Sequence, residues 1–215
     1  MTLSLEELRE EYRRAELGEA NCETNPIAQF QKWITEARNA DLKEPNAMTL
    51  ATATADGRPS ARIVLLKEVS ELGFVFYTNY DSRKGQELKT NPRCALTFYW
   101  AELERQVRVE GWVEKVSQEK SEAYFRKRPK GSRLGALVSN QSEVLPSRLP
   151  LEKRLAELEA EYASTDDVPA PANWGGYRVE PETLEFWQGR PNRLHDRLLY
   201  RRKDEDSWGV ERLAP

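Results

Sequence analysis

Histidine and cysteine are scarce in this sequence of 215 residues, which contains one histidine, His195, and two cysteines, Cys22 and Cys94. A single histidine excludes an HExxH zinc site and any metal centre built from several histidines. The cysteines lie far apart and outside any CxxC spacing, so they indicate neither a disulfide framework nor a zinc site. We therefore expect two reduced thiols and no bound metal.

The motifs of several common catalytic and nucleotide-binding folds are also missing. Neither GxGxxG nor GxxxxGKS/T occurs, which removes the usual dinucleotide and P-loop fingerprints. No GxSxG elbow exists to serve a Ser-His-Asp triad, and the arginines beside His195 disfavour the imidazolium that such a triad forms. The sequence therefore argues against nucleophilic hydrolysis.

Long apolar runs are absent as well. No stretch approaches the length of a membrane span, and the N-terminal MTLSLEELREEYRRAEL alternates apolar and charged residues without the apolar core of a signal peptide. Hydrophobic residues still make up 39% of the chain and charged residues 32%, which suits a folded core. We expect a cytoplasmic protein with one globular domain.

The distribution of charge is uneven. The formal net charge of -3 gives no overall attraction for polyanions. Positive charge is nevertheless dense locally, because five basic and no acidic residues occur from Arg126 to Arg133. Arginine and lysine also stand beside hydroxyl residues at several other positions. This pattern favours binding sites for phosphate groups over a nucleic-acid surface.

Apolar periodicity and turn residues predict short strands with helices inserted between them. Helices are expected at 3–17, 26–40, 82–90, 118–127, 132–138 and 149–163, the second capped by Asn25 and the third by Asp81 or Ser82. Strands are expected at 47–55, 60–69, 73–79, 94–100, 105–116, 177–179, 184–187, 193–201 and 208–213, of which the first three form a meander. The expected fold is mainly β with helices (α+β), an antiparallel barrel decorated by helices.

A series of short motifs runs along nearly the whole chain. They are RIVLLK at 62–67, FYTN at 76–79, SRK at 82–84, LERQVRVEG at 103–111, YFRKRP at 124–129, SNQS at 139–142, WGGYRV at 174–179, FWQG at 186–189 and RLHDR at 193–197. In order and spacing they resemble the pyridoxamine 5'-phosphate oxidase family, and FWQG followed by RLHDR is the most specific combination.

The resemblance implies one FMN-binding split β-barrel domain over 1–215. Its parts would be a helical N-terminal segment and lid at 1–45, barrel strands at 46–116, a helical insertion at 117–165 and C-terminal barrel strands at 174–215. It also implies a homodimer with FMN at the interface, and no nucleic-acid or membrane partner. The implied reaction oxidises pyridoxine 5'-phosphate and pyridoxamine 5'-phosphate with O2 to pyridoxal 5'-phosphate, releasing H2O2 and, from the amine, NH3, in vitamin B6 biosynthesis and salvage.

The resemblance also assigns site residues by position. FMN would contact Arg62, Ile63, Val64, Leu65, Leu66, Lys67, Tyr77, Thr78, Arg83, Lys84, Gln106, Gln141, Ser142, Trp187 and Arg197. The substrate would contact Arg9, Tyr12, Lys67, Tyr124, Arg128, Ser132, Arg193, Leu194 and His195. Among these, Arg193 and His195 would be catalytic, assisting proton removal while hydride passes from the C4' carbon of the substrate to the flavin.

Helix geometry supports two of these assignments. Arg83 and Lys84 stand at an expected helix start, where free N–H groups and the helix dipole favour phosphate. Tyr124 and Arg128 are four residues apart and would share one helical face. Without the resemblance, Arg83 and Lys84 could equally be solvated surface charges, and YFRKRP could be an exposed basic helix end that binds nothing.

Strand geometry gives one supporting and one conflicting expectation. Arg193, His195 and Arg197 would share one face of the strand expected at 193–201, because side chains alternate along a strand. Arg62 and Lys67, in contrast, are an odd number of residues apart and would face opposite sides. If both serve one cavity, the chain must bend near Lys67.

Three alternatives stay open. The chain could be a flavoprotein of the same barrel type with another substrate, or a non-catalytic carrier of FMN or a B6 vitamer. The basic segment from Arg126 to Arg133 could instead bind nucleic acid, which predicts a steeply salt-dependent affinity. Activity on pyridoxine 5'-phosphate separates the first, and binding without oxygen consumption identifies the second.

Overall fold

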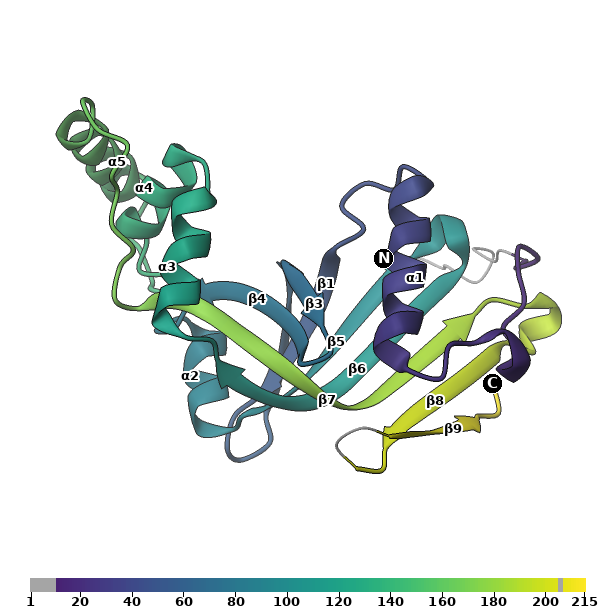
Figure 1. Cartoon of the computed structure of the whole chain (residues 1–215). Helices are drawn as coiled ribbons and strands as arrows, with labels where there is room; N and C mark the ends of the chain where they lie inside the picture. The colour runs from purple at the N-terminus through teal and green to yellow at the C-terminus, as the bar shows by residue number, and fades with distance from the viewer. Residues whose placement is uncertain (1–10, 205–206) are drawn as a thin grey trace, which may run out of the picture. The chain divides into compact units, whose positions relative to one another are not determined.

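The computed structural model describes residues 11–204 and 207–215, and Figure 1 shows its elements. The α-helices are α1 (Pro26–Asn39), α2 (Arg83–Thr90), α3 (Gln118–Lys127), α4 (Lys130–Val138) and α5 (Leu149–Glu161). The strands are β1 (Ala47–Ala53), β2 (Pro59–Leu65), β3 (Glu68–Ser70), β4 (Gly73–Asn79), β5 (Arg93–Trp100), β6 (Arg105–Lys115), β7 (Trp174–Gln188), β8 (Asp196–Arg202) and β9 (Trp208–Arg212). The fold class is therefore mainly β with helices, as predicted.

Hydrogen bonds join these strands in the order β2-β1-β5-β6-β7-β4-β3, and β8 pairs with β7 and β9. The predicted meander of the first three strands is confirmed only in part, because the second expected strand is divided into β2, which pairs with β1, and β3, which pairs with β4. β4 pairs antiparallel with β7, with Phe74 opposite Val179 and Thr78 opposite Gly175. β7 lies about a hundred residues further along the chain. Local sequence patterns therefore do not predict this pairing.

The chain folds as two compact units, each built from separated segments. The first takes residues up to 49 together with 95–110 and 181–215. Its helix α1 starts at Asn25, whose side chain accepts a hydrogen bond of 2.8 Å from the N–H of Ile27. The buried rings of Phe30 and Trp33 on α1 then pack against Phe98, at 4.9 Å, and Phe186, at 5.2 Å.

The second unit takes residues 50–94 and 111–180 and contains helices α2 to α5. Strand β4 is buried along nearly its whole length. A cluster of buried apolar side chains holds α3, α4 and α5 together, namely Phe125, Leu134, Leu158 and Val168. This packing fixes the two helices, α3 and α4, that contribute to the cavity described below.

Two further predictions need correction. The helix expected at 3–17 is absent from its described part, residues 11–17, because the backbone N–H groups of Arg13 and Arg14 donate to the carboxylate of Glu104 instead of forming helical bonds. The strand expected at 193–201 begins only at Asp196, since Arg193 ends a 3-10 turn with φ at 62°. The strands expected at 177–179 and 184–187 are parts of the single strand β7.

Within residues 11–204 and 207–215, no helix combines the length and apolar character that crossing a membrane requires. In the same residues, no cluster of three or more His, Cys, Asp or Glu side chains could hold a metal ion. The cytoplasmic location stays a prediction.

Candidate functional site

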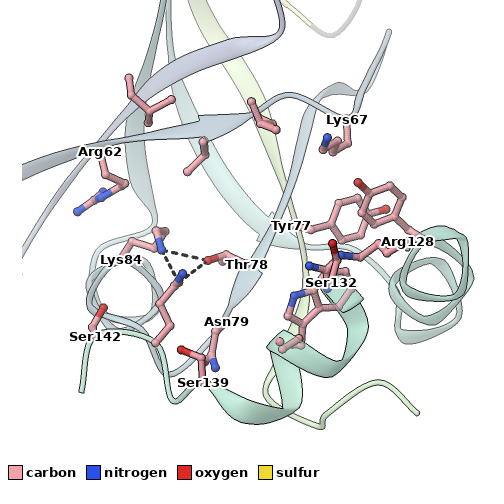
Figure 2. Close-up of a pocket in the computed structure, with 18 of the residues that line it drawn as sticks. Arg62, Lys67, Tyr77, Thr78, Asn79, Lys84, Arg128, Ser132, Ser139 and Ser142 are labelled. Carbon is pink, nitrogen blue, oxygen red and sulfur yellow. Dashed lines mark hydrogen bonds between the residues drawn. The ribbon is translucent and has the colours of Figure 1, made fainter. Parts of the chain in front are cut away.

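A large cavity of about 1060 Å³ lies in the second unit, lined by strands β2 and β4 and helices α2, α3 and α4 (Figure 2). Its lining comprises Ser60, Ala61, Arg62, Ile63, Val64, Leu65, Lys67, Tyr77, Thr78, Asn79, Arg83, Lys84, Tyr124, Lys127, Arg128, Pro129, Ser132, Gly135, Ala136, Ser139, Gln141, Ser142 and Trp174. Figure 2 shows two separate polar groups, one around Lys84 and Thr78 and one around Lys67, Arg128 and Ser132.

Lys84 is the central cation of the first group. The Ser82 side chain caps α2, which places Lys84 in the first helical turn with its side chain almost fully buried. Its Nζ donates to Oε1 of Gln141 at 2.6 Å and to Oγ1 of Thr78 at 3.1 Å. No carboxylate among the described residues pairs with it, and burial, helped by the charge of Arg62, lowers the pKa of Lys84 to about 8. A bound anion would supply the missing counter-charge.

A buried carboxylate holds the other cations of this group. Glu87 pairs with Arg62 at 3.4 Å and with Arg83 at 2.9 Å, and accepts hydrogen bonds from Thr52 and Ser60. Burial alone would raise the pKa of Glu87, but the bonds from Ser60, Thr52 and Arg83 lower it to about 2. Glu87 is therefore ionised at neutral pH and offsets part of the positive charge.

Arg62 is engaged almost entirely by the protein. Its Nη1 donates to the carbonyl of Leu50 at 3.2 Å and to Oγ1 of Thr52 at 2.6 Å, and its Nη2 donates to Ser60 and Glu87. Burial is the main cause that lowers the pKa of Arg62. Arg62 therefore contributes mainly positive charge to the cavity, because its N–H groups already donate to protein atoms. Nζ of Lys84, in contrast, donates only to neutral groups among the described residues.

Arg128 dominates the second group. It follows the end of α3, with its guanidinium carbon 4.9 Å from the ring centre of Trp174. Nη1 of Arg128 is buried and has no hydrogen-bond partner within the described part of the chain, and burial lowers the pKa of this side chain. Nearby, the rings of Tyr77 and Tyr124 are stacked with their centres 4.0 Å apart. An orphaned buried guanidinium donor indicates that this end also lacks an anion.

The odd spacing of Arg62 and Lys67 is resolved by the predicted bend. β2 ends at Leu65, and the N–H of Lys67 donates to the carbonyl of Val75 at 2.8 Å. Both Arg62 and Lys67 therefore line the cavity. Leu66, also assigned to FMN, is buried and does not line it.

A second cluster of predicted residues lies in the first unit. The ring of Tyr12 meets Trp187 edge-on at 5.6 Å and His195 at 5.8 Å, and Trp187 and His195 are 4.7 Å apart. Nδ1 of His195 accepts a hydrogen bond of 3.1 Å from the N–H of Arg190. Burial and then the charge of Arg193 lower the pKa of His195. Because Nδ1 accepts the bond from Arg190, a neutral ring carries its proton on Nε2.

The remaining predicted residues also lie in the first unit. Arg197 donates through Nε to Glu185 at 2.7 Å, a bond that raises the pKa of this arginine, and through Nη1 to the carbonyl of Ala214 at 2.8 Å. Gln106 lies half-buried in β6, and Leu194 is exposed. Arg9 lies outside the described residues.

The predicted shared strand face of Arg193, His195 and Arg197 is wrong, because only Arg197 lies in β8. Sequence reasoning also missed Trp174 and Glu87. Trp174 stands in a motif that carried the resemblance and could have been assigned from it. Glu87 gave no such signal, since a carboxylate is not expected among phosphate-binding cations.

Comparison with known proteins gives a consistent result. Residues 34–162 match the family model described as "Pyridoxamine 5'-phosphate oxidase", and residues 174–215 match "Pyridoxine 5'-phosphate oxidase C-terminal dimerisation region". Proteins named pyridoxine/pyridoxamine 5'-phosphate oxidase are 60% identical in Thermosynechococcus vestitus, covering 97% of this chain and 98% of theirs, and 57% identical in Salinibacter ruber, covering 98% and 99%.

Two solved structures share the fold. PhzG from Burkholderia lata 383, in complex with tetrahydrophenazine-1-carboxylic acid, has a TM-score of 0.85 at 33% identity, covering 91% of this chain and 95% of that one. A pyridoxamine 5'-phosphate oxidase-related, FMN binding protein from Nostoc punctiforme has a TM-score of 0.69 at 21% identity, covering 86% and 97%. The second likeness bears on the fold alone, which is the FMN-binding split barrel.

Proposed function

Because the chain belongs to the pyridoxamine 5'-phosphate oxidase family, we propose that it binds FMN and oxidises pyridoxine 5'-phosphate and pyridoxamine 5'-phosphate with O2. The products would be pyridoxal 5'-phosphate, H2O2 and, from the amine, NH3, a reaction that serves vitamin B6 biosynthesis and salvage.

One observation carries this proposal: a single cavity contains two separate cationic groups, and each offers buried donors that lack a counter-charge. A phosphomonoester satisfies such donors with charge-assisted hydrogen bonds. Two groups suit one phosphorylated cofactor and one phosphorylated substrate. We assign the Lys84 group to the phosphate of FMN and the Arg128 group to the phosphate of the substrate.

The residues present fit FMN. Lys84, Thr78, Gln141 and Ser142 offer an ammonium, hydroxyls and an amide around one point, and the N-terminus of α2 adds its dipole there. The cavity volume of about 1060 Å³ lies at the upper end of the usual range of ligand pockets, which leaves room for two ligands. When bound, FMN supplies the two-electron acceptor that O2 regenerates.

The protein itself would bind and orient the reactants. Arg128, Lys67, Tyr124 and Ser132 would hold the substrate phosphate. Arg193 and His195 would flank the pyridine ring and assist proton removal. Because Nδ1 of His195 already accepts a hydrogen bond, its neutral ring offers a donor at Nε2, so His195 would assist by steadying an oxygen substituent of the substrate and not by accepting the proton itself. An Arg193→Ala, His195→Ala double variant that keeps the wild-type kcat would contradict these roles.

The family match at 174–215 supports a homodimer, because that region is described as one for dimerisation. We propose that FMN binds at the interface between the two copies, where Gln106, Trp187 and Arg197 would complete its site. Light scattering checks the dimer directly.

An aerobic assay tests the activity. Purified protein with FMN and pyridoxine 5'-phosphate should produce pyridoxal 5'-phosphate and H2O2 in equal amounts. Omission of FMN from protein stripped of flavin is the control and should abolish both products. A yellow protein that yields neither product would contradict the proposal and favour a flavin enzyme for another substrate or a vitamer carrier.

A further inference from the structure

The N-terminal strap, defined here as residues 11–17, has its backbone tied near its start by the side chain of Glu104. The N–H groups of Arg13 and Arg14 donate to the same oxygen, Oε2 of Glu104, at 3.0 and 2.9 Å. Glu104 lies 90 residues away from Arg14 in sequence. Among the described residues, no side-chain cation pairs with Glu104, so its carboxylate serves the strap alone.

The backbone of Glu104 holds a second segment. Glu104 follows a 3-10 turn in the left-handed conformation, with φ at 54°. Its carbonyl accepts hydrogen bonds from the N–H of Gly189 at 2.7 Å and from Nε2 of Gln188 at 3.1 Å. Gln188 is fully buried and fixes the end of β7. One residue thus connects the strap to the turn that leads from Trp187 to His195.

Tyr12 is the strap residue that faces this turn, and its ring contacts both Trp187 and His195. The fit is close, because a Cβ atom added to Gly189 would stand 2.6 Å from Cγ of Tyr12. The ring of Tyr12 therefore packs directly against the backbone of Gly189, at a position where a side chain would displace it.

Residues 15–17 of the strap make other polar contacts. Arg190 donates to the carbonyl of Ala15 at 3.2 Å and pairs with Glu16 at 2.7 Å. The N–H of Leu17 donates to Asp196 at 3.0 Å. Nη1 of Arg14 also donates to the carbonyl of Glu102. Loss of the Glu104 carboxylate should therefore loosen residues 11–14, which keep that bond and the ring contacts of Tyr12, while residues 15–17 stay in place.

We propose that Glu104 is a positioning residue, which holds Tyr12 against Trp187 and His195 by binding two consecutive backbone N–H groups, and so sets the affinity for the phosphorylated substrate without touching it. The kinetic part rests on the proposed function, whereas the strap contact does not. Glu104→Ala removes the acceptor, and Glu104→Gln keeps an amide oxygen that can accept the same bonds. Glu102→Ala is the matched control, because this exposed carboxylate lies two residues away and accepts no hydrogen bond in the described structure.

The first readout is independent of activity. Trypsin cleaves after arginine, and cleavage after Arg13 or Arg14 requires the strap to open. Mass spectrometry of the full chain should show about tenfold faster cleavage there in Glu104→Ala, and wild-type rates in Glu102→Ala and, within about threefold, in Glu104→Gln. Equal rates in Glu104→Ala and wild type would overturn the strap contact.

The second readout is kinetic. Glu104→Ala should raise KM for pyridoxine 5'-phosphate about tenfold with kcat within about twofold of wild type, and the rise should disappear in a Tyr12→Ala background, because the carboxylate acts through that ring. A KM rise that persists undiminished in this background would overturn the positioning role. If the wild-type protein turns over no substrate while the cleavage rates differ as expected, the proposed function fails and the strap contact stands.

Discussion

The clearest consequence of the cavity electrostatics concerns Lys84 and the pH dependence of cofactor binding. Burial without a counter-charge lowers its pKa from 10.5 to about 8. At 1.36 kcal/mol for each pKa unit, the buried ammonium disfavours the flavin-free folded state by about 3 kcal/mol at neutral pH. Binding of a phosphate dianion reverses this, since the anion favours the charged form.

The sign of the effect follows from proton linkage. Below pH 8 Lys84 is already protonated, so FMN affinity should not depend on its titration. Above pH 8 a proton must be taken up on binding, and the Kd for FMN should rise up to about tenfold for each further pH unit. Without flavin, the unfolded chain binds the extra proton between pH 8 and 10.5, so this group makes the folded protein more stable as pH rises through that window.

Fluorescence quenching of FMN between about pH 7 and pH 9.5 measures the effect, with riboflavin as the ligand control because it lacks the phosphate. We expect the Kd for FMN to rise about tenfold or more over the upper part of this range and the Kd for riboflavin to stay level. Lys84→Met should remove the pH dependence and stabilise the flavin-free protein. A flat FMN curve, or a parallel rise for riboflavin, would refute the reasoning.

Three other changes test other parts of the site. Arg128→Ala should raise KM for pyridoxine 5'-phosphate about 10- to 100-fold, because it removes a charge-assisted contact worth about 1.5 to 3 kcal/mol. FMN affinity should stay the same, and the control Arg126→Ala should keep the wild-type KM. An unchanged KM in Arg128→Ala counts against the assignment. Glu87→Ala should cost about 3 kcal/mol in urea unfolding, because it leaves the half-buried Arg62 without its counter-charge. A loss below about 1 kcal/mol would contradict that view. Gly85→Ala should lower Tm strongly, since its Cβ would stand 2.1 Å from the carbonyl oxygen of Tyr80. Gly131→Ala is the control, because its Cβ would meet no atom within 4 Å, and its Tm should not fall strongly. Equal Tm values for the two variants would exclude the clash.

Local sequence patterns predicted those parts of the fold that depend on local interactions. The start of α2 was readable because the Ser82 side chain caps it within one helical turn. The strand expected at 105–116 is β6, in which Val107, Val109 and Val113 alternate with polar residues and are buried. Both features arise between residues close in sequence, which is why propensity and periodicity suffice.

The same reasoning failed at three points. The strap has helical periodicity, but a carboxylate 90 residues away takes its backbone N–H groups. The pairing of β4 with β7 depends on residues equally remote in sequence. Arg193 adopts a left-handed conformation that the motif RLHDR does not predict, and it therefore lies outside the strand. The resemblance to a family supplied the site residues that pattern reasoning could not.

The charges around Lys84 explain why a carboxylate is compatible with the proposed phosphate site. Arg62, Arg83 and Lys84 line the cavity, and Glu87 is ionised beside the two arginines. With Lys84 protonated the group carries a net charge of about +2, which matches a phosphomonoester dianion. Glu87 offsets one of the two arginine charges, so the arginines share one remaining charge while Lys84 carries a full charge whose donors have only neutral partners. Discrimination between FMN and an unphosphorylated flavin should therefore depend on this one ammonium more than on either arginine.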